Sequence, residues 1–458
     1  MKRTQGNMLE GPLAGGILLY TIPIVLTSVL QLLFNAADLI TVGRFCGSVS
    51  VAAVGATGAL TNLIVNLFFG LSIGAGVSVA HAIGSREDET VRRVVHTAIP
   101  TAILSGIFLT VVGIFLARPL LELMKTPKNV IGLSTIYMQI YFGGMTFNIV
   151  YNFCGSILRA AGDSTSPLVI LTCAGVLNVV LNLFFVIVLK MDVAGVALAT
   201  TISLAVSAVA ACAVLMRRKD SCKLEWNRLH IYKPQLLKMA RIGLPAGIQG
   251  SMFSISNVII QSAINSFGDV LMSGNAAVAN IEGFSYVTVN AFHQTAVNYI
   301  GQNAGAHQYH RISKIYKICM GYVTIAGLFT GILFYGFGPQ LLSLYVPDSQ
   351  EAIQAGMVRL AYTCLPYFVY GLMDVTTGAL RGLGASMISM VLSVLGICGI
   401  RVLWIGTIFR VPQYHTPDCL YASYLVSWVL TLVAQLAAFL IISNRYKKAL
   451  LAEDGKVG

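Results

Sequence analysis

Long apolar stretches alternate with short polar ones along most of the chain. A helix needs about 20 predominantly apolar residues to cross the hydrocarbon core of a bilayer. The pattern predicts an all-α membrane protein with several spans long enough to tilt or kink. Twelve membrane-spanning helices are expected, at residues 17–40, 51–80, 95–116, 131–156, 167–189, 195–216, 240–264, 274–301, 317–340, 352–379, 386–409 and 419–443.

The loops between these spans differ in positive charge. One set of alternate loops, which includes both ends of the chain, holds 22 of the 30 Lys and Arg residues, and the opposite loops hold 6. Loops rich in Lys and Arg stay on the cytoplasmic side of a membrane. We therefore expect both termini in the cytoplasm, and the even number of spans agrees.

The longest charged loop divides the chain into two halves. It covers residues 217–238 and separates an N-terminal lobe, 1–216, from a C-terminal lobe, 239–458, each with six predicted spans. Since six is even, both lobes should have the same orientation and be related by a pseudo-two-fold axis along the membrane normal. Many secondary transporters are built from such repeats, with the substrate site near the midplane.

A weak sequence repeat supports this division. Shifting the chain by about 222 residues pairs Pro23 with Pro245 and aligns LRAAG (158–162) with LRGLG (380–384). The matches are few, but they keep nearly the same offset across the half.

Composition excludes a soluble protein. The chain is 56% hydrophobic and 10% charged, whereas soluble domains carry about 25% charged residues. The net charge of +12 is concentrated in loops, so it indicates a membrane rather than nucleic acid. The nine cysteines are scattered without a CxxC pair and are interpreted as small buried residues, not metal ligands or disulfides.

Of the 18 acidic residues, three fall well inside predicted spans: Asp38, Glu282 and Asp374. A charge at the bilayer centre costs at least ~2.5–3.5 kcal/mol, so such residues usually face the interior and often serve function. The alternative is a hydrogen bond that holds helices together, or an acid near a helix end.

Asp38 has polar neighbours at helical spacing. Gln31, Asn35 and Asp38 are spaced i, i+4, i+7 and share one helix face. One carboxylate with amide and hydroxyl oxygens is a plausible site for a proton or a small hard cation such as Na⁺, although ordinary polar contacts between membrane helices remain an alternative. In the fifth span Asn178 and Asn182 are spaced i, i+4, and in the sixth Thr200, Ser203 and Ser207 form a further polar stripe.

The repeat does not reproduce this polar set, because the 222-residue shift maps Asp38 to Ile260 and Asn182 to Trp404. A purely architectural role would be expected in both halves, so we place a coupling site in the N-terminal half. A substrate cavity would be lined by a second set of polar residues: Gln31, Asn257, Gln261, Glu282, Tyr370 and Asp374.

No enzymatic motif is present. The chain lacks a Walker loop, a Gly-x-Ser-x-Gly elbow and HExxH. Neither ATP nor another cofactor is expected, and an enzyme is not indicated.

The chain resembles the multidrug and toxic compound extrusion (MATE) transporters of prokaryotic type. The resemblance covers essentially the whole chain in family order. It is carried by EGPLAGGILLYTIPIVLTSVLQLLFNAADLITVGRF (10–45), VLNVVLNLFF (176–185), VAGVALATTIS (193–203), the two LRxxG sites and YIGQNAGA (299–306).

The resemblance implies twelve helices in two six-helix lobes, and export of amphipathic, often cationic compounds in exchange for Na⁺ or H⁺ by alternating access. It implies that Asp38 is the coupling acid, that Pro23 is the helix-bending proline, and that Asn178 and Thr200 are partners of the acid. In one departure, Asn182 stands where many members carry a second acid. This departure weakens the expectation of Na⁺ and favours H⁺.

The expected setting is the cell membrane, with membrane lipids and small organic cations as partners and the chain as a monomer. The alternative is a lipid or lipid-linked oligosaccharide flippase of the same broader exporter group. A flippase is expected to have a wide cationic cavity, for which the spans offer Arg359 and Arg401.

Overall fold

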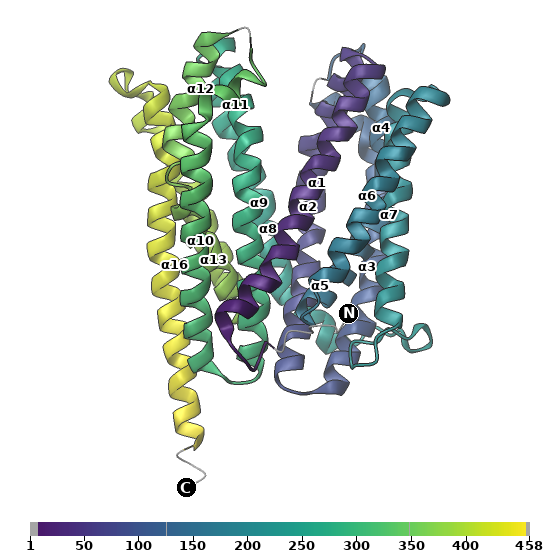
Figure 1. The fold of residues 1–458 in the computed structure, drawn as a ribbon, viewed down its shortest axis with the longest axis vertical. Helices are drawn as coiled ribbons and strands as arrows, with labels where there is room; N and C mark the ends of the chain where they lie inside the picture. The colour runs from purple at the N-terminus through teal and green to yellow at the C-terminus, as the bar shows by residue number, and fades with distance from the viewer. Residues whose placement is uncertain (1–7, 125, 348, 455–458) are drawn as a thin grey trace. The chain divides into compact units, whose positions relative to one another are not determined.

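The computed structural model describes residues 8–124, 126–347 and 349–454. Within these ranges all regular structure is helical, as the sequence predicted, and no strand occurs (Figure 1). The chain forms two compact units. Unit 1 comprises Ile22–Gly247, and unit 2 comprises the described residues of Asn7–Thr21 together with Ile248–Gly458. The boundaries therefore fall inside two long helices, α1 (Leu13–Phe45) and α8 (Lys233–Asn265).

Unit 1 contains the greater part of α1, the first part of α8 and the helices between them. In unit 1, α3 packs on α4 and α5, while α6 packs on α7. The intervening helices are α2 (Ser48–Gly84), α3 (Asp88–Leu123), α4 (Ile131–Gly143), α5 (Met145–Ala160), α6 (Thr165–Leu183), a π-helical turn η1 (Phe184–Val188), α7 (Asp192–Met216) and a short 3₁₀ turn η2 (Trp226–Arg228).

Unit 2 contains the start of α1, the rest of α8 and all later helices. Here α9 packs on α10, α12 and α13, and α13 packs on α16. The later helices are α9 (Asp269–Gly305), α10 (Tyr309–Gly336), α11 (Gly338–Ser343), α12 (Gln350–Thr363), α13 (Tyr367–Gly382), α14 (Ser386–Ser393), a π-helical stretch η3 (Val394–Gly399), α15 (Ile400–Gly406), two 3₁₀ turns η4 (Ile408–Arg410) and η5 (Pro412–Tyr414), and α16 (Pro417–Asp454).

Each predicted span falls on one helix or on consecutive helices, with two informative differences. The expected fourth span, 131–156, is broken at Gly144 between α4 and α5, and the tenth, 352–379, is broken before Tyr367 between α12 and α13. Eight helical segments of the described chain are by themselves long and apolar enough to cross a membrane. The remaining predicted spans either are divided by these breaks into shorter helices or, in α8 and α9, contain more polar residues, which lower their mean hydropathy.

The two halves share backbone features as well as sequence. The helices α1 and α8 both have 33 residues, and α2 and α9 both have 37. Left-handed backbone conformations also recur at an offset of 221 or 222 residues, which supports an internal repeat. The pairs with positive φ are Gly47 and Gly268, Arg86 and His307, and Gly162 and Gly384.

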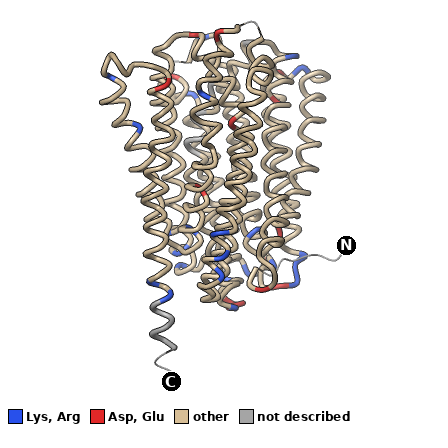
Figure 2. The backbone as a smooth tube through the Cα atoms, turned by 60° about the vertical axis from the view of Figure 1, so that its left-hand side comes forward, with Lys and Arg blue, Asp and Glu red and all other residues tan. Residues whose placement is uncertain are grey.

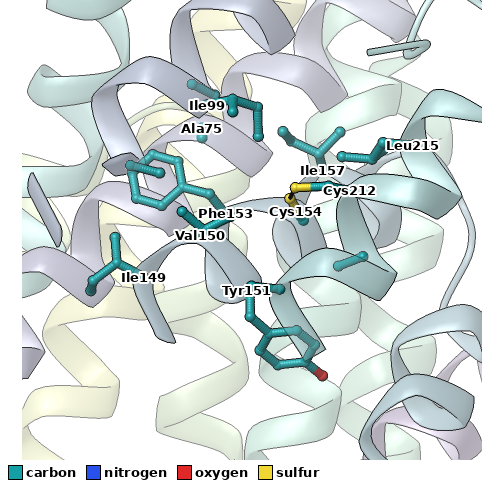
Figure 3. Close-up of a cluster of buried hydrophobic side chains, with 14 of the residues drawn as sticks. Ala75, Ile99, Ile149, Val150, Tyr151, Phe153, Cys154, Ile157, Cys212 and Leu215 are labelled. Atoms are coloured by element: carbon teal, nitrogen blue, oxygen red, sulfur yellow. Dashed lines mark hydrogen bonds between the residues drawn. The ribbon is translucent and has the colours of Figure 1, made fainter. Parts of the chain in front are cut away.

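The largest apolar core of unit 1 lies where α5 packs against α2, α3 and α7. Phe153 and Ile157 of α5 are fully buried there with Ile99 of α3 (Figure 3). The sulfur atoms of Cys154 and Cys212 lie 3.7 Å apart without a covalent bond. Both cysteines are thus free thiols packed in the apolar core. Figure 2 shows that Lys, Arg, Asp and Glu gather mainly at helix ends and in loops, while the middles of the helices carry few of them.

Glycine allows a very close helix crossing within unit 1. A Cβ added to Gly70 of α2 would lie 2.3 Å from the backbone nitrogen of Gly247, and one added to Gly74 would lie 2.1 Å from the carbonyl oxygen of Met239. Each helix presents two glycines four residues apart, Gly70 with Gly74 and Gly243 with Gly247. Small residues at this spacing let membrane helices approach backbone to backbone.

Gly74→Ala should therefore destabilise unit 1. The added methyl group meets backbone rather than a flexible side chain, so α2 and α8 must separate, and overpacking of this kind typically costs about 1–3 kcal/mol. Thermal unfolding of the purified protein in detergent measures the effect. Gly132→Ala is the matched control, because its Cβ would have open space; equal unfolding temperatures for the two variants would contradict the close crossing.

The first part of α1 is held by unit 2. The hydroxyl groups of Thr21 and Thr295 are 2.8 Å apart, and the rings of Tyr20 and Tyr299 meet edge to face at 5.5 Å. Pro23 follows directly, and α1 continues through it. Because proline lacks an N–H, it removes one backbone hydrogen bond from the helix and makes this point the easiest place for α1 to bend.

A buried arginine stabilises the loop after α7 through hydrogen bonds and ion pairs. Arg218 is 5% exposed, donates from Nε to both carboxylate oxygens of Asp220 at 3.0 Å, and lies 3.8 Å from Asp163. Burial alone would raise the pKa of the Asp220 carboxyl. The hydrogen bonds and positive charge of Arg218 outweigh burial, so this pKa lies below its ordinary value.

The loop should consequently become less stable when the pH is lowered into the acid range. A carboxyl whose pKa is lower in the folded than in the unfolded state stabilises the fold above its ordinary pKa, and that stabilisation is lost as the pH falls through the folded-state pKa. Hydrogen exchange of residues 217–224 should accelerate relative to the intrinsic rate on acidification. Asp220→Asn should exchange fast at neutral pH and lack this acid-dependent step; an unchanged acid step in the variant would refute the assignment.

Candidate functional site

Three helices of unit 1 bring a carboxylate together with amide and hydroxyl groups. Asn182 of α6 donates from Nδ2 to Oδ1 of Asp38 on α1, and the Thr200 hydroxyl of α7 donates to Asp38 Oδ2 at 3.4 Å. Thr200 also bonds the Val196 carbonyl oxygen at 3.0 Å, as is common for threonine in helices. The residues that sequence spacing grouped around Asp38 thus converge from separate parts of the chain.

Asn178 links these partners to one another. Its Nδ2 lies 3.4 Å from the Thr200 hydroxyl, and its Oδ1 accepts from Asn182 Nδ2 at 3.2 Å. Asn178 and Asn182 are only 6% and 1% exposed. The Oδ1 atom of Asn182 is buried and has no hydrogen-bond partner among the described residues, which leaves one acceptor oxygen unused beside Asp38.

The local backbone positions this site. Asn178 and Asn182 are one helical turn apart on α6, so both side chains lie on the same face. The helix then widens into the π-helical turn η1 immediately after Leu183. Such turns are frequent at functional sites because they rotate the helix face that follows them.

Two tyrosines of α4 lie within electrostatic range of Asp38. They are Tyr137 and Tyr141, one turn apart and stacked with ring centroids 6.1 Å from each other. Sequence reasoning did not assign them to the site, since tyrosine is common in membrane helices and their spacing carries no distinctive signal.

Two predicted neighbours do not join the Asp38 network. Gln31 and Asn35 are exposed, and neither bonds Asp38 or its partners among the described residues. Asn35 shares a face of α1 with Asp38 but makes no contact with this network in the described conformation, and its part in coupling stays a prediction.

Glu282 of unit 2 forms a buried ion pair. Arg359 of α12 donates from Nη2 to Glu282 Oε2 at 2.5 Å and from Nε to Oε1 at 3.1 Å, while Thr363 donates its hydroxyl to Oε1. Arg359 also bonds Asn275 of α9. Both carboxylate oxygens are therefore engaged.

Asp374 of unit 2 is joined to an arginine through a histidine. His293 Nδ1 is hydrogen-bonded to the backbone carbonyl oxygen of Asp374 at 2.8 Å and lies 3.1 Å from its Oδ1, and His293 Nε2 lies 3.3 Å from Nη1 of Arg381. Arginine can only donate, so Nε2 is the acceptor and the proton is on Nδ1. Arg381 also donates to Gln249 at 2.8 Å; it is 7% exposed and part of a buried cluster.

The remaining cavity candidates of unit 2 are dispersed. Tyr370 packs in an aromatic cluster with Tyr367 and Trp428. Asn257 is exposed, and Gln261 is exposed and bonded to Asn265 and Asn275. These contacts do not test whether the residues line a substrate pathway.

Asp38 differs from the other two membrane acids in its partners. Glu282 has Arg359 and Asp374 has His293, whereas Asp38 forms no ion pair with any described residue. Sequence analysis identified all three acids but missed His293, and it did not pair Glu282 with Arg359. The high cost of lone membrane charges was a signal that partners exist, but it could not say which.

The donor set suits a proton or a hard cation. The oxygens of Asp38, Asn178, Asn182 and Thr200 are the ligand type that Na⁺ accepts. Within the described residues there is no cluster of three or more His, Cys, Asp or Glu side chains that could hold a metal ion.

The fold and site define a polytopic helical membrane protein with one carboxylate that lacks a basic partner. The family model MatE matches residues 23–184 and 245–405, one stretch in each half. The chain belongs to the MatE family, the MATE transporters, whose members are membrane transporters rather than enzymes.

Two relatives from Bacillus subtilis (strain 168) match over most of the chain. The probable multidrug resistance protein YoeA is 27% identical over 84% of both chains, and YpnP, with the same description, is 28% identical over 87% of this chain and 88% of its own. A crystal structure of MATE in complex with MaL6 has a TM-score of 0.88 and 20% identity over 98% of this chain and 99% of that one. This likeness confirms the predicted twelve-helix fold in two six-helix lobes.

Proposed function

We propose that the chain is a secondary active antiporter that exports amphipathic compounds, cationic drugs among them, in exchange for H⁺ or Na⁺ by alternating access. The observation that carries this proposal is the state of Asp38. Among the three membrane acids of the described chain, it alone is contacted only by amide and hydroxyl groups, whereas Glu282 is paired with the Arg359 guanidinium and Asp374 lies against the His293 ring. A carboxylate without a permanent counter-ion is free to take up and release one.

The partners of Asp38 suit both of its charge states. When Asp38 is ionised, Asn182 Nδ2 and the Thr200 hydroxyl donate to it. When a proton or Na⁺ is bound, turning the Asn182 amide by half a rotation presents its unused Oδ1 to the acid proton or to the cation. The same residues therefore stabilise the site before and after ion binding.

Neutralisation of Asp38 would be transmitted through α1. Asp38 lies fifteen residues beyond Pro23, where a backbone hydrogen bond is missing, and the residues before Pro23 are held by Tyr299 and Thr295. Loss of the charge replaces the hydrogen bonds donated by Asn182 and Thr200 with a different set of contacts, so the part of α1 beyond Pro23 can repack. Ion and substrate then compete by favouring different conformations.

The composition of the site favours H⁺ over Na⁺. Asp38 is the sole carboxylate of the network, since Asn178, Asn182 and Thr200 are neutral. One negative charge suffices for a proton, whereas removal of a second acid weakens the attraction for Na⁺. On the basis of the loop charges, we propose a location in the cell membrane with both termini in the cytoplasm.

Uptake of a fluorescent organic cation into inverted membrane vesicles tests the proposal. A proton gradient and a Na⁺ gradient are imposed separately, and vesicles without the protein are the control. Uptake that follows one gradient supports antiport and identifies the ion. No uptake under either gradient would contradict drug antiport and favour the lipid-flippase alternative.

A further inference from the structure

Unit 2 contains three buried arginines, two inside predicted spans and Arg381 in the last turn of α13, and their charges are not compensated equally. Arg359, Arg381 and Arg401 are 7%, 7% and 5% exposed. Arg359 has the Glu282 carboxylate, and Arg381 reaches Asp374 through the His293 ring. Two acids thus serve two of the arginines, which leaves Arg401 as the surplus positive charge.

Arg401 forms no ion pair with any described residue. Its Nε donates to the Ser427 hydroxyl at 3.1 Å, and its guanidinium carbon lies 4.1 Å from the centre of the Tyr424 ring. Glu282 is no substitute partner, because both of its oxygens already accept from Arg359 and Thr363. Of the five N–H donors of a guanidinium, one is used by a described residue.

The position of Arg401 makes this state costly. It belongs to the span Ser386–Arg410 and lies nine residues before the end of that span, roughly 13 Å along a helix. An uncompensated charge at such depth is expensive and marks a functional site by default. If this position only had to fill space between helices, an apolar side chain of similar size would do so without the cost of burying a charge.

A series of aromatic rings in contact with one another begins at the ring beside Arg401. Tyr424, below the guanidinium, is 5.9 Å from Trp428, and Trp428 is 5.5 Å from Tyr370. Aromatic rings at these spacings stack with flat organic molecules, and a guanidinium fork binds carboxylates and phosphates in bidentate geometry. The two features together match a flat aromatic molecule with an anionic group.

We propose that Arg401, with Tyr424 and Trp428, is a recognition point in unit 2 for aromatic compounds that carry a carboxylate or phosphate. The inference extends the substrate class of the transporter proposed above and rests on that function only for the direction of transport. Binding at Arg401 is a property of unit 2 and does not require an ion gradient.

Two dyes of the same ring system test this recognition. Fluorescein is anionic at alkaline pH and rhodamine 123 is cationic, and fluorescence anisotropy measures the binding of each to the full chain in uncharged detergent. Arg401→Gln should weaken fluorescein binding by roughly tenfold or more, as expected when a charge-assisted hydrogen bond is lost, and leave rhodamine 123 binding unchanged. Arg401→Lys should retain part of the fluorescein affinity, and Arg410→Gln, at an exposed position, is the charge-matched control.

Competition separates the aromatic from the anionic requirement. Benzoate should displace fluorescein from the wild-type protein, and acetate should not. The proposal is overturned if Arg401→Gln binds fluorescein as wild type does, if the wild-type protein does not bind fluorescein, or if acetate competes as well as benzoate. If Arg401→Gln fails to fold, the Arg401→Lys variant and the wild-type competition decide.

The two proposals fail separately. Fluorescein binding that depends on Arg401, without gradient-driven uptake of any dye, would contradict antiport and support the anion site. Gradient-driven uptake of the cation, with fluorescein binding unaffected by Arg401→Gln, would do the reverse.

Discussion

Asp38→Asn is expected to abolish gradient-driven accumulation of substrate while substrate binding persists. Asparagine has nearly the shape of aspartate, so the contacts with Asn182 and Thr200 can be retained, but it cannot bind a proton or neutralise Na⁺ at neutral pH. Uptake into inverted vesicles should fall to the level of vesicles without the protein. Binding of the same dye in detergent should remain measurable but become weaker, because a permanently neutral residue 38 favours the ion-loaded conformation.

Asp418→Asn is the matched control for this prediction. Asp418 lies in the first turn of α16 and is exposed, so the same chemical change there should leave uptake at the wild-type level. Full gradient-driven uptake by Asp38→Asn would show that the ion couples elsewhere in the chain.

Arg359→Met should be among the most destabilising single substitutions in unit 2. It leaves the Glu282 carboxylate buried with Thr363 as its remaining partner. Removing one partner of a buried ion pair typically costs about 3–5 kcal/mol, whereas replacing both by apolar residues is often neutral. The double variant Glu282→Met with Arg359→Met should therefore recover most of the loss.

Unfolding of the two single variants, the double variant and wild type in detergent gives the coupling energy. Arg410→Met, which removes an exposed arginine, should lie within about 0.5 kcal/mol of wild type. Strict additivity of the two single substitutions would show that Glu282 and Arg359 do not act as a pair.

Periodicity along the chain was sufficient to predict the helical fold, because each membrane helix must bury its backbone hydrogen bonds within itself. The breaks at Gly144 and before Tyr367 were less accessible. Helix-breaking residues stand at both points, Gly143 with Gly144 and Pro366. Such residues also occur inside continuous helices, as Pro23 does in α1, so the sequence alone could not show that the helices end there.

Spacing showed that Asn178 and Asn182 share a face, but it did not separate Thr200 from the other hydroxyls of its span, and the resemblance to the MATE transporters singled out Asn178 and Thr200 as partners of Asp38. The acids of unit 2 could not be assigned in the same way. Sequence places Glu282, Asp374, Arg359 and Arg401 inside predicted spans and Arg381 in a loop. The pairing of these residues depends on tertiary contacts between helices far apart in the chain.

Ion release on substrate binding tests the central claim most directly, because it asks whether Asp38 exchanges an ion for substrate. Rhodamine 123 is added to the purified protein in weakly buffered solution, and the proton or Na⁺ released is measured for wild type and Asp38→Asn. The account predicts that wild type releases roughly one ion per bound dye near the pH at which Asp38 titrates, and that Asp38→Asn releases none. Saturating dye that releases no ion from the wild-type protein at any pH would contradict it.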